Sequence, residues 1–394
     1  MIHIEPRKFF SYAIILFILL VTASANPVTT SKGFSIGGWI FFTGVYFYFE
    51  NLIKPKLILL FGIFIALLVF YYLQNNAINT TTYIGLFINI LLCYYCRDLT
   101  KEHFYDYFTN VMYVFACISL VIYPFQFISF ETLYNINNIF RLEVSEYDWV
   151  NSFIHTTTPI HKHRNAGFTW EPGGFATILT LTYFLNIFQR KEPLKSKKNI
   201  IFLITLLTTQ STMGITSLVF PFGIALGDLI LSNKIYKQLS IIIIPTVIVI
   251  FSVIFFQVDF LYKKIVNEFG SLDVEMGHIN YAIEKDLRLD ISRSASFALD
   301  WPTIKEYPVL GLGVDYRTTS FHLFGYHDKL QGSCGWNNLL LRFGFIGFIF
   351  YAYLFYRFSD FSRRIEKIAW VLLIFYTLFT EEYSPTPFFH LFIF

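Results

Sequence analysis

Long runs of apolar residues alternate with short polar stretches along most of the chain. A helix that crosses the hydrocarbon core of a bilayer needs about 20 mostly apolar residues. A lipid-exposed backbone must satisfy its own hydrogen bonds, so we predict helices for these runs. The predicted helices, about eleven in number, are Phe9–Ala25, Phe34–Phe49, Lys56–Leu73, Thr82–Cys96, Tyr105–Ile128, Pro172–Phe188, Ile200–Thr212, Gly214–Leu231, Ser240–Phe256, Asn338–Phe358 and Ile368–Glu381.

The pattern breaks at Gln210–Gly214, where polar residues and a glycine separate two helices that are short for full crossings. Such a break is tolerated at membrane depth only where protein or a cavity surrounds it. The sequence leaves two readings open, a re-entrant pair or two crossings with close packing of small residues. Either way, the two helices return the chain to the side from which it came.

The basic residues of the short connections lie almost entirely on one side of the predicted bundle. They occupy residues 7–8, 54–56, 97–101, 190–198, 234–237 and 357–367, whereas the opposite short connections carry only Lys32. Cytoplasmic connections are rich in Lys and Arg, so we predict a cytoplasmic N-terminus. The chain then divides into helices 1–128, a first outer loop 129–171, helices 172–256, a second outer loop 257–337 and helices 338–394.

Composition agrees with an integral membrane protein. Of 394 residues, 55% are hydrophobic and 14% charged, against about 25% charged in soluble domains. Both long loops mix aromatic residues, glycines and charges, so we expect them to be folded. Cys93, Cys96 and Cys117 lie in predicted helices, which leaves Cys334 without an outer partner for a disulfide.

One polar segment, HRNAGFTWEPGGFA (163–176), leads directly into an apolar helix. Arg164 carries a fixed charge and a planar fork of donors suited to phosphate. Gly167, Gly173 and Gly174 allow a close backbone approach, and Glu171 precedes a proline at the first helical position. A purely structural interpretation also exists, in which Arg164 reaches lipid headgroups, Glu171 caps the helix and the glycines turn the chain.

Three further motifs follow this segment. They are Ser211-Thr212-Met213-Gly214, the stretch from Arg293 to Pro308-Val309-Leu310-Gly311-Leu312-Gly313, and Trp336-Asn337-Asn338 before Gly344 and Gly347. In this order, over roughly residues 160–350, the four motifs resemble those of the O-antigen polymerase and ligase superfamily of bacterial inner-membrane proteins. The ligase branch has Asn-Pro where this chain has Glu171-Pro172, and His-Asn where it has Trp336-Asn337, so the polymerase branch is favoured.

The resemblance implies an all-α integral membrane glycosyltransferase of the C type (GT-C-like) with two periplasmic loops. Its substrate would be an oligosaccharide repeat unit on undecaprenyl diphosphate, without nucleotide sugar, cofactor or metal. His161 and His163 lack a nearby acidic ligand, which also argues against a metal site. Expected partners are the lipid-linked oligosaccharide and membrane lipid, with a chain-length regulator protein as a further candidate and no nucleic acid.

The resemblance and the chemistry together give candidate site residues. Arg164 and Arg293 would stabilise the diphosphate leaving group. The base that takes the acceptor proton stays open among Glu171, His163, His322 and His327. Candidate substrate-binding residues are Gly167, Gly173, Gly174, Ser211, Thr212 and Asn337. The alternatives are an O-antigen ligase and a lipid-linked oligosaccharide flippase or transporter, although transporters often show internal repeats and we detect none.

Overall fold

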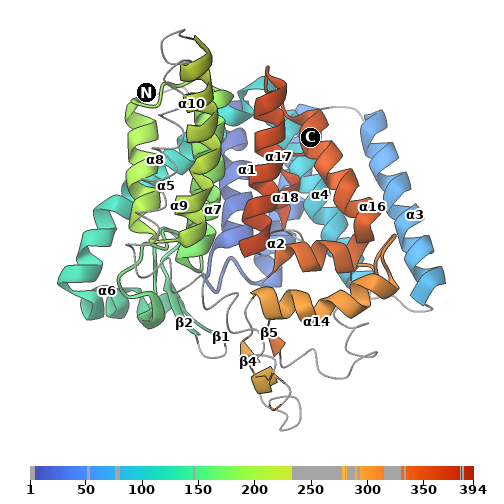
Figure 1. The fold of residues 1–394 in the computed structure, drawn as a ribbon, viewed down its shortest axis with the longest axis horizontal. Coiled ribbons are helices and arrows are strands. Elements are labelled where there is room, and N and C mark those ends of the chain that lie inside the picture. Colours follow the sequence, from blue (N-terminus) through green and yellow to red (C-terminus); the bar gives the residue numbers. More distant parts are fainter. Residues whose placement is uncertain are drawn as a thin grey trace.

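The protein is a helical bundle with a small β-structure at one end (Figure 1). The computed structural model describes residues 5–50, 54–75, 80–144, 147–232, 277–279, 281, 289–290, 293–314, 330–331, 334–381, 383 and 386–394. The predicted helix at Ser240–Phe256 lies outside these residues, as do His322 and His327.

Ten of the predicted helices fall within described residues, and each is helical. The helices are α1 (Pro6–Ala23), α2 (Lys32–Phe49), α3 (Pro55–Asn75), α4 (Thr80–Thr100), α5 (Phe104–Ile128), α6 (Phe130–Asn137), α7 (Pro172–Phe188), α8 (Lys197–Thr208), α9 (Thr212–Ser217), α10 (Val219–Ser232), α14 (Arg293–Glu306), α16 (Gly335–Phe358), α17 (Arg364–Thr380) and α18 (Pro387–His390). The strands are β1 (Arg141–Val144), β2 (Tyr147–Asn151), β3 (Thr156–Thr157), β4 (Leu289–Asp290) and β5 (Leu330–Gln331).

Three helical stretches are long and apolar enough to cross a membrane among the described residues. These are Pro6–Ala23, Thr81–Ile128 (α4 and α5 with the 3-10 turn between them) and Gly335–Phe358. Shorter apolar helices cover Leu57–Leu73, Pro172–Phe188 and Thr212–Asp228. Length and composition therefore indicate a membrane protein.

Helix starts follow local chemistry. The side chains of Ser31, Ser196 and Ser211 accept hydrogen bonds from backbone N–H groups in the first turns of α2, α8 and α9. Proline opens α1 and α7, where the missing N–H costs nothing. Nearly every residue of α7 is buried, because α5, α8, α9 and α17 pack around it. This central helix fixes the position of the motif that precedes it.

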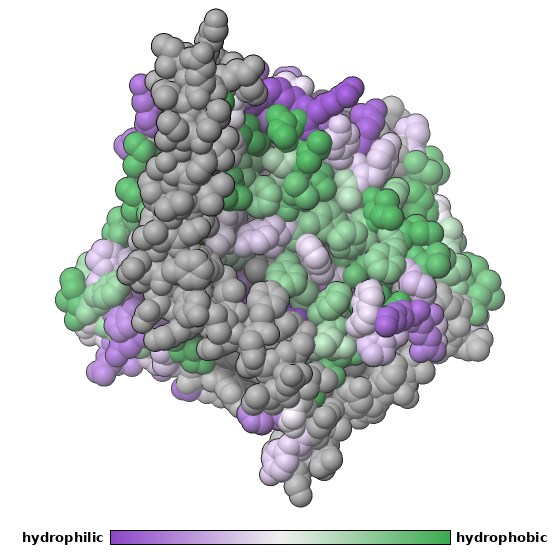
Figure 2. All heavy atoms as spheres, viewed as in Figure 1, coloured by the Kyte–Doolittle hydropathy of each residue, from purple (hydrophilic) through white to green (hydrophobic). Residues whose placement is uncertain are grey.

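The basic helix ends gather at one end of the bundle and form ion pairs there. Arg7 contacts Glu50 at 2.7 Å, and Lys54 bridges Glu50 (2.9 Å) and Asp98. Figure 2 shows apolar residues across the middle of one face and hydrophilic residues at this upper end. Arg7, Lys54 and Lys101, which the sequence assigned to one side, therefore lie together in space, since all three pair with Glu50.

The first long loop is folded, as expected, at the opposite end. An antiparallel sheet of order β1-β2-β3 is its centre, with Arg141 opposite Val150 and Val150 opposite Thr157. Asn151 at the end of β2 is fully buried and ties the sheet to the bundle, since its Nδ2 donates to Phe168 O at 2.9 Å and Asn26 Nδ2 donates to its carbonyl at 2.6 Å.

The Pro308–Gly313 motif has a structural role that the sequence did not reveal. Helix α16 is kinked at Gly344 (φ 60°, ψ −167°), which interrupts its hydrogen bonds. Residues 308–313 supply replacements: Leu312 N and Gly313 N donate to Leu341 O (2.6 Å) and Arg342 O (3.0 Å), while Phe345 N and Ile346 N donate to Pro308 O (2.7 Å) and Val309 O (3.1 Å). We call this arrangement the kink clasp. It satisfies backbone groups that would otherwise be buried unpaired.

After α17 the chain turns back through the bundle, which the sequence analysis did not predict. The return segment comprises Tyr383 and residues 386–394, nearly all of them buried. Tyr383 Oη donates to Gly174 O (3.0 Å) at the start of α7, and Arg97 Nε donates to Phe394 O (3.1 Å) at the basic end. The segment thus connects the two ends of the bundle.

Candidate functional site

The segment before α7 docks on the break between α8 and α9. Asn165 N donates to Thr208 O (3.0 Å), and Asn165 Nδ2 donates to Thr208 Oγ1 (2.9 Å). Asn165 Oδ1 accepts from Gly167 N (2.9 Å), which holds the turn in which Gly167 has a φ of +51°. Two of the sequence motifs are therefore neighbours in space.

Arg164 lies against this break, half-buried. Its Nε donates to Thr209 O at 3.1 Å. Burial lowers the pKa of Arg164, and the carboxylates of Glu171 and Glu381 act in the opposite direction. Because a guanidinium stays protonated even so, Arg164 presents a permanent positive charge that interacts electrostatically with two acidic residues.

Glu171 and Glu381 approach each other over Gly173, in the first turn of α7. A Cβ added at Gly173 would clash with Glu381 Oε1 and would lie 3.5 Å from Glu171 Oε1. Glu381 is only 4% exposed, whereas Glu171 is half-buried. Gly173, which we predicted to bind substrate, thus makes room for the carboxylate of Glu381.

Glu171 is the N-cap residue of α7, but its side chain makes no capping hydrogen bond. The structural interpretation, in which the Glu171 carboxylate caps the helix by a hydrogen bond, is therefore wrong. The side chain remains near the positive end of the helix, where it can act on something other than the helix backbone.

Tyr383 completes the surroundings of the helix start. Its Oη would lie 2.9 Å from a Cβ at Gly174, and its ring centroid lies 5.4 Å from that of Trp170. Burial first, and then the charges of Glu381 and Glu171, raise the pKa of Tyr383. The phenol therefore stays protonated and donates to Gly174 O.

Sequence reasoning missed both Glu381 and Tyr383. The available signal was the acidic pair Glu381-Glu382 at the end of an apolar helix, since such residues are costly there and often functional.

The Ser211–Gly214 motif serves helix packing. Ser211 Oγ accepts from Gly214 N (3.4 Å) as the N-cap of α9. A Cβ at Gly214 would lie 2.9 Å from Ala176 Cβ, so α9 and α7 are in close contact. Thr212 Oγ1 is buried and has no hydrogen-bond partner within the described part of the chain.

Arg293 and Asn337 lie at the same end of the molecule. Asn337 is fully buried, and its Nδ2 donates to Asp300 Oδ2 (2.9 Å) and Ser296 Oγ (3.3 Å), which holds α14 on α16. Arg293 opposes the rise in the pKa of Cys334 that burial causes, so its charge lies near the start of α16. There a Cβ at Gly335 would lie 2.6 Å from Glu381 O, which links this region to the carboxylate pair.

His163 is exposed and lies outside this group. Its ring stacks on Phe127 with centroids 5.3 Å apart. Its carbonyl accepts hydrogen bonds from Tyr123 Oη (2.9 Å) and Gln210 Nε2 (3.3 Å). The histidine backbone therefore fixes the loop, while its ring faces the side of α5.

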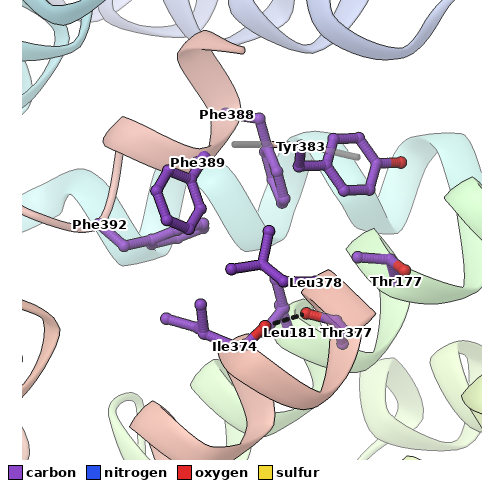
Figure 3. A pocket seen from close by; sticks show the side chains of 9 residues that line it. All are labelled: Thr177, Leu181, Ile374, Thr377, Leu378, Tyr383, Phe388, Phe389 and Phe392. Atoms are coloured by element: carbon purple, nitrogen blue, oxygen red, sulfur yellow. Dashed lines mark hydrogen bonds between the residues drawn. The ribbon is translucent and has the colours of Figure 1, made fainter. Parts of the chain in front are cut away.

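A small cavity of about 10 Å³ lies behind the start of α7 (Figure 3). It is lined by Thr177, Leu181, Ile374, Thr377, Leu378, Tyr383, Phe388, Phe389 and Phe392. A volume of this size admits about one water molecule, so a sugar does not fit there. Substrate would have to approach the carboxylates from the outer surface.

No family model, curated protein or solved structure matches the chain. Functional assignment therefore depends on the geometry of these residues and on the motif resemblance.

Proposed function

We propose that the protein is an inner-membrane glycosyltransferase that polymerises undecaprenyl-diphosphate-linked oligosaccharide units into O-antigen or a related surface polysaccharide. The observation that carries this proposal is the pair of carboxylates, Glu171 and Glu381, that meets over Gly173 in the first turn of α7, within electrostatic range of the Arg164 guanidinium. One cation for an anionic leaving group and one acid for proton transfer are the two functions this chemistry needs.

The proposal includes a topology of about eleven spans with both long loops in the periplasm. The ion pairs that Arg7 and Lys54 form with Glu50 and Asp98 support it, since residues from two of the basic connections meet there. Helix α14, which begins at Arg293, and the sheet of the first loop lie at the other end (Figure 1). Arg164 and Glu171 come between that sheet and α7 in the chain. A periplasmic site suits a lipid-linked substrate whose sugars face that compartment.

The proposed step forms one glycosidic bond and breaks one. A hydroxyl at the non-reducing end of a new lipid-linked unit attacks the anomeric carbon at the reducing end of the growing chain. The bond from that carbon to the diphosphate breaks, and its electron pair leaves with undecaprenyl diphosphate. The hydroxyl proton passes to a carboxylate.

Burial divides the roles between the two carboxylates. Glu171 is half-buried and can reach an acceptor at the surface, so we assign it the proton. Glu381 is 4% exposed, and its place over Gly173 suits a residue that positions the start of α7. Arg164 and the α7 N-terminus would share the diphosphate.

Lipopolysaccharide from a strain lacking the chromosomal gene tests this assignment. Arg164→Lys keeps the charge but loses the forked donors, and losing one donor to a developing anion typically costs about 2.7–4 kcal/mol, or roughly 10²–10³ in rate. We expect core plus one repeat unit from Arg164→Lys and no ladder from Arg164→Ala. The matched control is Arg357→Lys, an exposed arginine at the basic end, which should give a full ladder.

The outcomes separate the candidate functions. Bare core in the null strain would identify a ligase, because a ligase mutant cannot attach even one unit. A parental ladder from Arg164→Lys at equal protein level would show that Arg164 is an interface anchor.

A further inference from the structure

Helix α6 is arranged differently from the helices of the bundle. It follows α5 directly and lies at the side of the lower end, roughly crosswise to the bundle (Figure 1). Helix α6 packs on β2 and β3, and Asn137 at its end is buried. Its other residues do not contribute to the protein core.

Large apolar side chains project from this helix and its surroundings. Ile136 is 69% exposed and Ile139, in the turn that follows, is 83% exposed. Phe127 (55%) and Ile128 (78%) at the end of α5 continue the surface. We call these four residues the α5–α6 ledge. The same flank continues along α5 through Val121 and Phe125, within a helical stretch apolar enough to cross a membrane.

We infer that the α5–α6 ledge lies in the headgroup region of the bilayer, with its apolar side chains among the upper acyl chains. Continuity with the apolar flank of α5 supports this occupant, because lipid that covers α5 would meet the ledge without a gap. Within α6, Ile136 shares one exposed side with Thr132, next to the side that carries Glu131 and Asn135. An amphipathic helix at a membrane surface buries its apolar side about 5–10 Å deep.

A lysine accompanies the ledge. Lys162 is exposed, and its Nζ lies 5.1 Å from the centroid of the Phe130 ring at the start of α6. An aromatic ring with an ammonium group above it suits the boundary between acyl chains and phosphates.

The ledge would also set the level of the headgroups relative to the candidate site. Phe127 stacks on His163, and Tyr123 donates to the His163 carbonyl. Arg164 is the next residue, so this arginine follows directly on a residue that contacts the ledge. The lipid contact itself requires only that the helices are embedded in a membrane, and it can be tested without the proposed enzymatic activity.

Depth-dependent quenching tests the inference. Single cysteines at Ile136 and Ile139, with Glu131 and Asn135 as matched exposed controls, would carry an environment-sensitive fluorophore in a background without the native cysteines. In nanodiscs of phosphatidylethanolamine and phosphatidylglycerol, a nitroxide on an upper acyl carbon should quench Ile136→Cys and Ile139→Cys more strongly than the controls. Equal quenching at all four positions would overturn the inference. So would quenching of Ile136→Cys and Ile139→Cys that is no stronger with the lipid nitroxide than with a water-soluble quencher.

A second measurement needs no substitution. The unmodified protein in nanodiscs that contain a lipid with a photoreactive diazirine on an upper acyl carbon should acquire labels on the peptide around residues 127–139. Labels confined to α3 and α16, with the ledge peptide detected but unmodified, would refute the contact even if the cysteine variants failed to fold.

Discussion

The kink clasp makes a sharp prediction about Gly344. Its φ of 60° and ψ of −167° fall in a region of backbone conformation that is accessible essentially to glycine alone. A Cβ added at Gly344 would also clash with Val309 O, a backbone atom that cannot rotate away. Gly344→Ala should therefore force the two halves of the clasp apart.

The magnitude follows from two terms. Backbone strain at such a position costs about 1–3 kcal/mol. Separation also weakens the bonds from Phe345 N to Pro308 O and from Ile346 N to Val309 O, each worth about 0.5–1.5 kcal/mol. The expected loss is roughly 2–6 kcal/mol.

Thermal unfolding in detergent, followed by fluorescence-detected size-exclusion chromatography, measures this loss. The matched control is Gly62→Ala in α3, where an added Cβ meets nothing within 4 Å. Helix propensity should make that variant as stable as the parent or slightly more so. Equal midpoints for the two variants would show that the clasp does not hold α16.

Gly311→Ala provides a consistency check. Its φ is +67°, and a Cβ would lie 2.6 Å from Leu341 O and 2.7 Å from Gly344 N. Because both glycines serve one contact, the double variant should be less destabilised than the sum of the single variants. Simple additivity would mean that the two sites act independently.

Two further predictions concern the loop and the return segment. Burial lowers the pKa of His155 to about 4 from 6.5. Between these two values the unfolded chain binds a proton that the folded loop does not. The free energy of unfolding should therefore fall by about 2 kcal/mol from pH 7 to pH 5. His155→Leu should remove this dependence of the melting midpoint, and an unchanged slope would refute it. Arg97→Gln loses the bond to Phe394 O and should cost about 1.5–3 kcal/mol, seen as faster proteolysis of the C-terminal segment, with exposed Arg357→Gln as the unaffected control.

The helices could be predicted because each is encoded by one contiguous apolar stretch of sequence. Apolar stretches and the proline at the first position of α7 are local signals, and the described helices lie where these signals predict them. The return segment escaped prediction because Pro387–Phe394 is too short for a crossing. Its place in the core depends on partners distant in sequence, such as Thr22, whose Oγ1 accepts from Phe388 N at 3.3 Å.

The candidate site was predictable only in part, for the same reason. Arg164 and Glu171 stand out because charge and glycine interrupt an apolar pattern. Glu381 is separated from Glu171 by more than half of the chain length, and only tertiary packing brings both to Gly173. The structural role of the Pro308–Gly313 segment could not be predicted, because it depends on the kink at Gly344 of α16, which is distant in sequence.

The two carboxylates at Gly173 should respond differently to the same substitution, and this decides between chemistry and structure. Glu171→Gln removes a half-exposed charge that makes no capping bond, so stability should fall by at most about 0.3–1 kcal/mol, whereas loss of a general base lowers the rate by about 10²–10⁴. Glu381→Gln alters a carboxylate that is 4% exposed. We expect it to lower the free energy of unfolding by about 1–3 kcal/mol, which is measured as a lower melting midpoint. Lipopolysaccharide ladders and melting curves of both variants, compared at equal protein level, separate the effects. A full ladder from Glu171→Gln would exclude this residue as the base and transfer that role to Glu381 or to a histidine of the second loop.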